Sequence, residues 1–154
     1  MIDSAKVNEV CSETLKEQGA FLVELMVSAG NQILIRADHP DGMNLKKLAQ
    51  VHRAIEGAFD REEEDFDIEV SSPGATEPFK VLEQYLKNVG RDVKVTTHQG
   101  EVHQGVLDKF ENDQLTLSWK ERVPKEIGKG KRTVTRECCV ALSTIKETRL
   151  ELKF

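Results

Sequence analysis

The sequence is poor in residues that would cross-link a small fold or line an aromatic pocket. Its 154 residues include three cysteines, four prolines, one tryptophan and one tyrosine. Cys11, Cys138 and Cys139 are odd in number and lack the spacing of a disulfide framework, so we expect reduced thiols. No apolar run approaches the length of a membrane span, and no basic-then-apolar leader opens the chain. We therefore expect a cytoplasmic protein that does not enter a membrane.

Catalytic and cofactor motifs are also missing. Ser71 and Ser72 are not part of a GxSxG elbow, and no glycine-rich phosphate loop follows a strand and opens a helix. The four histidines are scattered, and none has metal-ligand spacing. Consecutive carboxylates at 62–65 repel one another and do not converge on one point, which favours a solvated loop over a metal site. We therefore expect no enzymatic activity, no catalytic residue, no metal and no cofactor.

Charge is abundant and unevenly divided between the two halves. Residues 1–78 hold 7 Lys and Arg against 16 Asp and Glu, a net charge of −9. Residues 79–154 hold 15 against 11, a net charge of +4. This asymmetry predicts an acidic part and a basic part that have different neighbours.

The first half follows a helix–strand–strand–helix–strand pattern. Asp3 or Ser4 can cap a first helix that ends at Gly19, and two strands at 20–28 and 33–38 flank a turn. A second helix and a third strand follow, which predicts two helices on one face of a three-stranded sheet. The expected buried side of the first strand consists of four alternating apolar residues: Phe21, Val23, Leu25 and Val27.

The stretch 66–79, FDIEVSSPGATEPF, joins the two halves. Pro73 cannot donate to a strand ladder, and Pro-Gly suits the centre of a type II turn with Gly74 at positive φ. Thr76, Glu77 and Pro78 have the chemistry of a helix start. We expect an interdomain junction motif made of Ser71, Ser72, Pro73 and Gly74.

The second half begins with a short amphipathic helix and continues as five strand-like segments. The helix stripe is expected to be Phe79, Leu82, Leu86 and Val89. The apolar phase slips around Gly105, which indicates a bulge or bend, and the parity of Trp119 favours a core position. The last strand is expected around Leu150, Leu152 and Phe154. Five short strands in this length predict a small closed or nearly closed barrel.

A strand that ends in EVSSPG, preceded by an α-β-β-α pattern and followed by a helix and a small β domain, resembles the ribosome maturation factor RimP family. The resemblance covers nearly the whole chain and implies an SH3-like (Sm-like) barrel. We therefore expect an α+β protein with an N-terminal two-layer α/β domain (α-β-β-α-β) at 1–76, a connecting helix at 77–90 and an SH3-like β-barrel domain at 91–154. Family members commonly have an arginine where this chain has Glu77, so no RNA contact by that arginine is carried over.

The resemblance further implies a cytoplasmic, non-catalytic factor that binds the free small (30S) ribosomal subunit and assists its assembly. The implied partners are the ribosomal protein S-twelve and 16S rRNA, and we expect a monomer. From the charge split we add the hypothesis that the acidic half faces basic ribosomal protein and that the basic loop of the second half faces RNA phosphates. A non-ribosomal adaptor with a peptide-binding SH3-like barrel is the alternative function.

The cations that we expect to bind the ribosome or RNA lie between the third and fourth strands of the second half. Gly128 and Gly130 make the middle of this segment flexible, and such a basic finger suits phosphate backbones. A solubilising hairpin tip is the structural alternative. The segment holds Glu121 and Glu126 as its only acids and seven cations: Lys120, Arg122, Lys125, Lys129, Lys131, Arg132 and Arg136.

Overall fold

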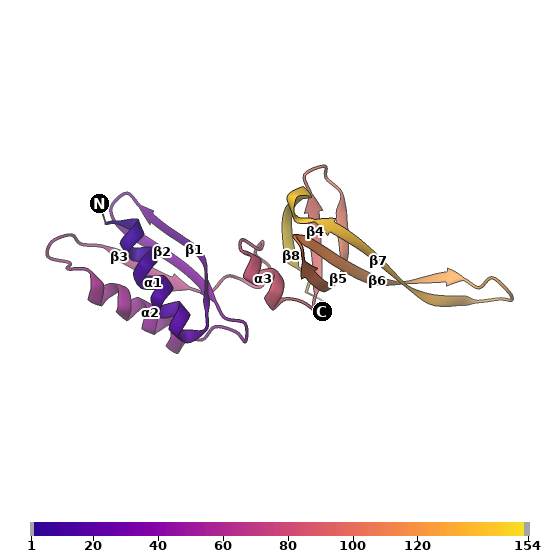
Figure 1. Cartoon of the computed structure of the whole chain (residues 1–154), viewed down its shortest axis with the longest axis horizontal. Coiled ribbons are helices and arrows are strands. Elements are labelled where there is room, and N and C mark those ends of the chain that lie inside the picture. Colours follow the sequence, from indigo (N-terminus) through magenta and orange to yellow (C-terminus); the bar gives the residue numbers. More distant parts are fainter. Residues whose placement is uncertain (1, 153–154) are drawn as a thin grey trace. The chain divides into compact units, whose positions relative to one another are not determined.

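The chain divides into two compact units, Met1–Gly74 and Ala75–Phe154, in the computed structural model, which describes residues 2–152. The first unit holds two helices and a three-stranded sheet (Figure 1). The second holds a short α-helix, a 3-10 helix and a five-stranded sheet. The expectation of an α+β protein is thereby confirmed.

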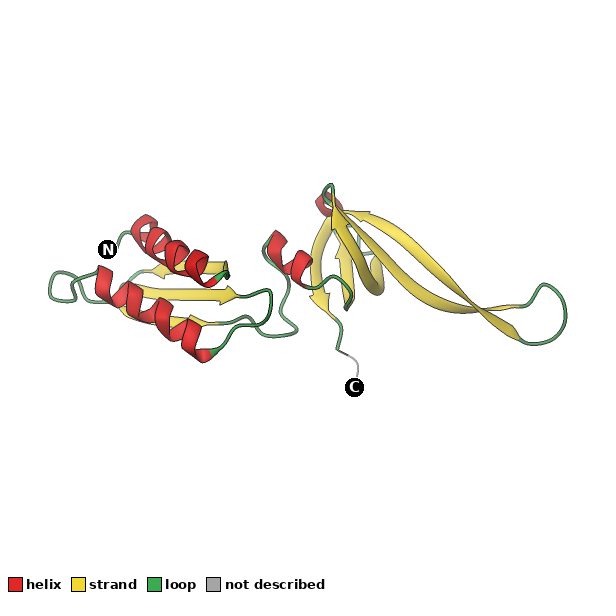
Figure 2. Ribbon diagram, turned by 60° about the horizontal axis from the view of Figure 1, so that its bottom comes forward, coloured by secondary structure: helices red, strands yellow, loops and turns green. Residues whose placement is uncertain are grey.

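The first unit is a two-layer arrangement with both helices on one face of the sheet (Figure 2). Strand β2 is central, antiparallel to β1 and parallel to β3. The side chains of Asp3 and Asn44 accept hydrogen bonds from the backbone N–H groups of Ala5 and Lys47, which caps both helices. The elements are α1 (Ser4–Gln18), β1 (Phe21–Ser28), β2 (Gln32–Asp38), α2 (Leu45–Ala58) and β3 (Asp67–Ser71).

A bulge in β1 changes which side chains of that strand face the core. The register with β2 slips between Leu22 and Glu24. Leu22, Leu25 and Val27 pack against the core cluster that includes both helices, whereas Phe21 and the buried Val23 do not belong to that cluster. The prediction that Phe21, Val23, Leu25 and Val27 share one side is therefore wrong, because the bulge shifts the alternation by one residue.

The junction folds differently from its prediction. The turn falls at residues 75–76, after the Pro-Gly pair, and α3 (Leu82–Lys87) begins well after Thr76. Two interactions explain the delay. The N–H of Phe79 donates to the Thr148 carbonyl at 2.8 Å, which holds this stretch extended, and the side-chain oxygen of Gln84 accepts from Val81 N at 3.1 Å, which starts the helix later.

Helix α3 also buries a different face from the predicted one. Leu82 and Leu86 are 47% and 58% exposed, while Gln84 and Tyr85 are buried. The Tyr85 ring stacks on Phe110 with centroids 5.0 Å apart. The predicted stripe is thus wrong for Leu82, Leu86 and Val89, because Tyr85 provides the contact with the sheet. Phe79 does pack against this core, as predicted.

The five-stranded sheet of the second unit is antiparallel and open. Its strand order is β7-β6-β5-β4-β8, and within residues 2–152 no sheet closes into a barrel. The closed form of the expected barrel is therefore not observed, because β7 pairs with β6 alone. The elements are β4 (Asp92–Thr97), β5 (Val102–Glu111), β6 (Gln114–Pro124), β7 (Lys131–Ala141), η1 (Leu142–Thr144) and β8 (Ile145–Leu150).

Gly105 is required by a close approach of two strands. A Cβ at this position would lie 2.6 Å from the carbonyl oxygen of Ser118 on β6. The register slip predicted near this glycine occurs further along, between Leu107 and Lys109. The glycine therefore permits contact between backbones, and the bulge is a separate feature.

The last strand begins and ends earlier than its predicted position. Strand β8 starts at Ile145, directly after η1, and stops at Leu150. Leu152 is outside the strand and 46% exposed, and Phe154 lies outside the described residues. The core of this unit is formed by Val93, Val95, Leu107, Leu115 and Leu117, all fully buried.

Candidate nucleic-acid interface

Residues 119–136 form a two-stranded arm that extends beyond the five-stranded sheet (Figure 1). Pairing of β6 with β5 ends at Ser118, which is opposite Val106. Pairing of β6 with β7 continues for six further positions, from Trp119 opposite Arg136 to Pro124 opposite Lys131. At the usual rise of a strand, the paired part of the arm is roughly 20 Å long.

The arm ends in a glycine-containing loop at residues 125–130. Gly128 and Gly130 have φ values of 90° and 103°, which L side chains rarely adopt. The N–H of Lys125 donates to the Gly130 carbonyl at 3.2 Å and closes the loop. The loop is exposed throughout, so its two lysines, Lys125 and Lys129, are accessible.

The structure places all seven predicted binding cations on this arm, and each is exposed. Two of them have carboxylate partners: Arg136 Nε is 3.1 Å from Glu121 Oε2, and Arg132 Nη2 is 3.9 Å from Glu126 Oε1. The other five have no ion-pair partner among residues 2–152: Lys120, Arg122, Lys125, Lys129 and Lys131.

Trp119 lies at the root of the arm and not in the core. Its Nε1 donates to Glu121 Oε1 at 3.1 Å, and it is absent from the described side chains that pack on the core. The core position predicted for Trp119 is wrong because β6 has passed the last residue paired with β5. Hydrogen bonds from Trp119 and then Arg136 lower the pKa of Glu121, so this carboxylate stays ionised at neutral pH.

The register assigns the side chains of the arm to two faces, since directly opposed residues of antiparallel strands point to the same side. We define the outer face as the three pairs Lys120–Thr135, Arg122–Thr133 and Pro124–Lys131. We define the inner face as the three pairs Trp119–Arg136, Glu121–Val134 and Val123–Arg132. The hydrogen bonds that Glu121 accepts from Trp119 and Arg136 lie on the inner face.

The junction residues belong to the first unit. Ser71 is the last residue of β3, where it lies opposite Arg36 of β2, and Gly74 is the last residue of the first unit. The structure thus assigns Ser71 a place in the sheet ladder and gives Ser72 and Pro73 no hydrogen bond or ion pair among the described residues.

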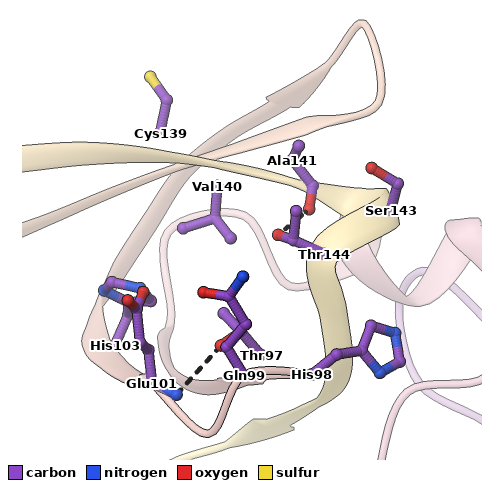
Figure 3. A pocket seen from close by; sticks show the side chains of 10 residues that line it. All are labelled: Thr97, His98, Gln99, Glu101, His103, Cys139, Val140, Ala141, Ser143 and Thr144. Atoms are coloured by element: carbon purple, nitrogen blue, oxygen red, sulfur yellow. Dashed lines mark hydrogen bonds and ion pairs between the residues drawn. The ribbon is translucent and has the colours of Figure 1, made fainter.

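A cavity of about 520 Å³ in the second unit was not predicted from the sequence (Figure 3). It lies between the β4–β5 turn, which carries His98 and Glu101, and the end of β7, which carries Val140. His103 Nε2 is 3.6 Å from Glu101 Oε2. Only tertiary packing brings these two segments together, so no local sequence motif could have predicted the cavity.

Two classes of site are not found among residues 2–152. No group of three or more His, Cys, Asp and Glu side chains could hold a metal ion. No helix in this range has the length and apolar character needed to cross a membrane.

The chain resembles known proteins along nearly its whole length. The family model for the RimP N-terminal domain matches residues 10–76. Proteins named ribosome maturation factor RimP are 37% identical over 150 residues in Christiangramia forsetii, covering 97% of both chains, and 37% identical over 143 residues in Flavobacterium psychrophilum, covering 92% of both. The chain belongs to the RimP family. A further RimP, from Porphyromonas gingivalis, is 30% identical over 147 residues, 96% of this chain and 97% of that protein.

Membership of the RimP family confirms the resemblance that EVSSPG and its context indicated. The alignments with RimP proteins extend well past the N-terminal domain, so the second unit also lies within the matched length. These matches indicate a family of ribosome maturation factors and no family of enzymes.

Proposed function

We propose that this RimP family protein is a cytoplasmic, non-catalytic maturation factor that binds the free small (30S) ribosomal subunit as a monomer and assists its assembly. The relatives that span the chain are named ribosome maturation factor RimP, which supports a role in ribosome maturation. The observation that carries the docking part of the proposal is the arm, where five exposed cations have no ion-pair partner among residues 2–152. Such cations can replace the counterions of RNA phosphates.

The two units have opposite net charges, and in the proposal they bind different partners. The first holds 7 Lys and Arg against 15 Asp and Glu, a net of −8, and the second holds 15 against 12, a net of +3. In the proposal, the acidic unit faces basic ribosomal protein and the arm faces 16S rRNA, while the sheet of the second unit contacts S-twelve. Complementary charges would steer the encounter and fix its orientation.

In this proposal, the N-terminal domain is 1–76, the connecting segment is 77–90 and the C-terminal domain is 91–154. The C-terminal domain is an open form of the SH3-like (Sm-like) barrel, which its five consecutive antiparallel strands support. Two irregularities of the kind that curve such sheets support this proposal too. One is the slip of β5 between Leu107 and Lys109, and the other is the slip of β8 between Ile145 and Glu147 where it pairs with β4.

The experiment is a binding titration of purified small subunits with the full chain at rising salt. The variant Lys129→Glu, Lys131→Glu, Arg132→Glu is expected to weaken binding and flatten its salt dependence. A matched control reverses three cations of α2 in the acidic unit: Lys46→Glu, Lys47→Glu, Arg53→Glu. Equal weakening by both variants would mean that overall charge, and not the arm, controls binding. Unchanged binding of the arm variant at every salt concentration would reject the proposal.

A peptide-binding adaptor is the second candidate function, and one observation favours it. The cavity of Figure 3 includes Val140 and Ala141 on β7, whose outer edge has no strand partner among residues 2–152. Such an edge can accept an extended peptide. Failure of the protein to co-sediment with free small subunits, together with capture of an extended peptide, would favour the adaptor.

A further inference from the structure

We propose that the arm binds double-stranded RNA through its outer face alone, and that the inner face has a structural role. This inference rests on the proposed ribosomal function and names the part of the arm that touches RNA and the kind of RNA it touches. All five cations lie in the same basic segment of the sequence. The inference assigns RNA contact to Lys120, Arg122 and Lys131, and a structural role to Arg132 and Arg136.

The outer face has the composition of a phosphate-binding surface. Lys120 and Arg122 are two residues apart on β6, so they lie about 7 Å apart along one side of the strand and can contact different phosphates. Lys131 extends the row on β7, and none of the three has an ion-pair partner among the described residues. Thr133 and Thr135 stand opposite Arg122 and Lys120 and offer hydroxyl groups to phosphate or ribose. Among the paired residues from Ser118 to Glu137, this side of the ribbon carries one carboxylate, Glu137, which lies opposite Ser118 at the root.

The inner face uses its cations within the arm. Glu121 accepts from Arg136 Nε and from Trp119 Nε1, both at 3.1 Å, which joins the two strands at the root. Arg132 Nη2 lies 3.9 Å from Glu126 of the tip loop. The positive charge of both arginines is therefore offset locally, and an RNA phosphate would have to compete with a carboxylate for each.

The outer face also lacks what single-stranded RNA binders use. Such proteins stack unpaired bases on aromatic side chains, whereas duplex RNA is bound mainly through its backbone and shape. Within the arm, the single aromatic residue is Trp119, which lies on the inner face with its N–H engaged by Glu121. A row of cations and threonines without an aromatic platform matches the backbone of a duplex.

The test compares two variants of the full chain that lose the same charge from opposite faces. The outer variant is Lys120→Thr, Arg122→Thr, and the inner variant is Arg132→Thr, Arg136→Thr. Each is titrated with a 20-base-pair RNA duplex and with single-stranded oligo(A) of the same length, from 50 to 200 mM salt. The thermal midpoint of each variant shows that its fold is retained.

The wild-type protein is expected to bind the duplex more tightly than the single strand. The outer variant should lose about tenfold or more in duplex affinity and reduce the salt slope by about 1.5, whereas the inner variant should change affinity less than about threefold. Equal losses in both variants, a larger loss in the inner variant, or tighter binding of oligo(A) would overturn the inference. Small-subunit binding by the wild type is measured in parallel. Its absence would reject the proposed function, while its presence together with equal losses would reject only the assignment to one face.

Discussion

The phenolic hydroxyl of Tyr85 donates a hydrogen bond of 2.9 Å to Oγ1 of Thr148, a residue with no exposed surface. This bond joins α3 to β8 inside the second unit. Tyr85→Phe is expected to lower the free energy of unfolding by about 1–2 kcal/mol, because the buried Thr148 hydroxyl loses this partner. Urea unfolding followed by the fluorescence of Trp119, the one tryptophan of the chain, measures the change.

A double-mutant cycle with Thr148→Val separates this bond from other effects of removing the hydroxyl. Tyr85→Phe should cost less in the Thr148→Val background than in the wild type. Equal costs in both backgrounds would show that the hydrogen bond contributes nothing to stability.

Glycine-to-alanine substitutions at two positions should change stability in opposite directions. At Gly105 the new Cβ would lie 2.6 Å from the Ser118 carbonyl oxygen, so we expect destabilisation by about 2 kcal/mol or more. At Gly57, in helix α2, a Cβ would meet nothing within 4 Å, so we expect stabilisation by about 0.5–1 kcal/mol. The free energy of unfolding of each variant is measured by urea unfolding, followed by Trp119 fluorescence and far-ultraviolet circular dichroism. A change of the same sign in both variants would contradict this prediction.

Stability should fall with rising pH because of one buried thiol. Burial raises the pKa of Cys11 from 9.0 to about 11. Between these values the unfolded chain loses the thiol proton and the folded protein keeps it, so the unfolded state is favoured progressively as pH rises. Below pH 9 the contribution is constant. The difference in unfolding free energy between wild type and Cys11→Ala should therefore be constant below pH 9 and should shrink between pH 9 and pH 11. If this difference does not depend on pH over that interval, the thiol does not titrate in this way.

Acid should break the contacts at the root of the arm only at a pH below the ordinary pKa of a glutamate. The hydrogen bond from Trp119, followed by that from Arg136, lowers the pKa of Glu121 below its usual 4.5. The contacts are thus present above that pKa and are lost as pH falls through it. Trp119 emission should show a transition with an apparent pKa below 4.5, and Glu121→Gln should abolish it. The same transition in the glutamine variant would assign it to another group.

The order of helices and strands could be predicted from the sequence because caps, glycines and apolar periodicity are local. Asp3 and Gly19 act at the positions that their chemistry indicated. Helix α3 shows where local patterns fail. Its apolar stripe suggested a buried Leu82 and Leu86, but aromatic contacts of Tyr85, made by tertiary packing, orient the helix differently.

The site was predicted as a list of cations but not as a surface. Composition identified the basic segment, whereas its two faces depend on the register of β6 against β7. Trp119 follows the parity of the buried Leu115 and Leu117, yet it lies beyond the last residue paired with β5. Parity can assign a side of a strand but cannot tell where the core ends.

Co-sedimentation in a density gradient tests the central claim most directly, that this RimP family protein acts by docking on the small ribosomal subunit. The full chain is mixed with free small subunits or with assembled ribosomes at low and at physiological salt. The account predicts that the protein migrates with free small subunits, is absent from assembled ribosomes and is released as salt rises. A protein that stays at the top of the gradient with free small subunits at low salt would contradict it.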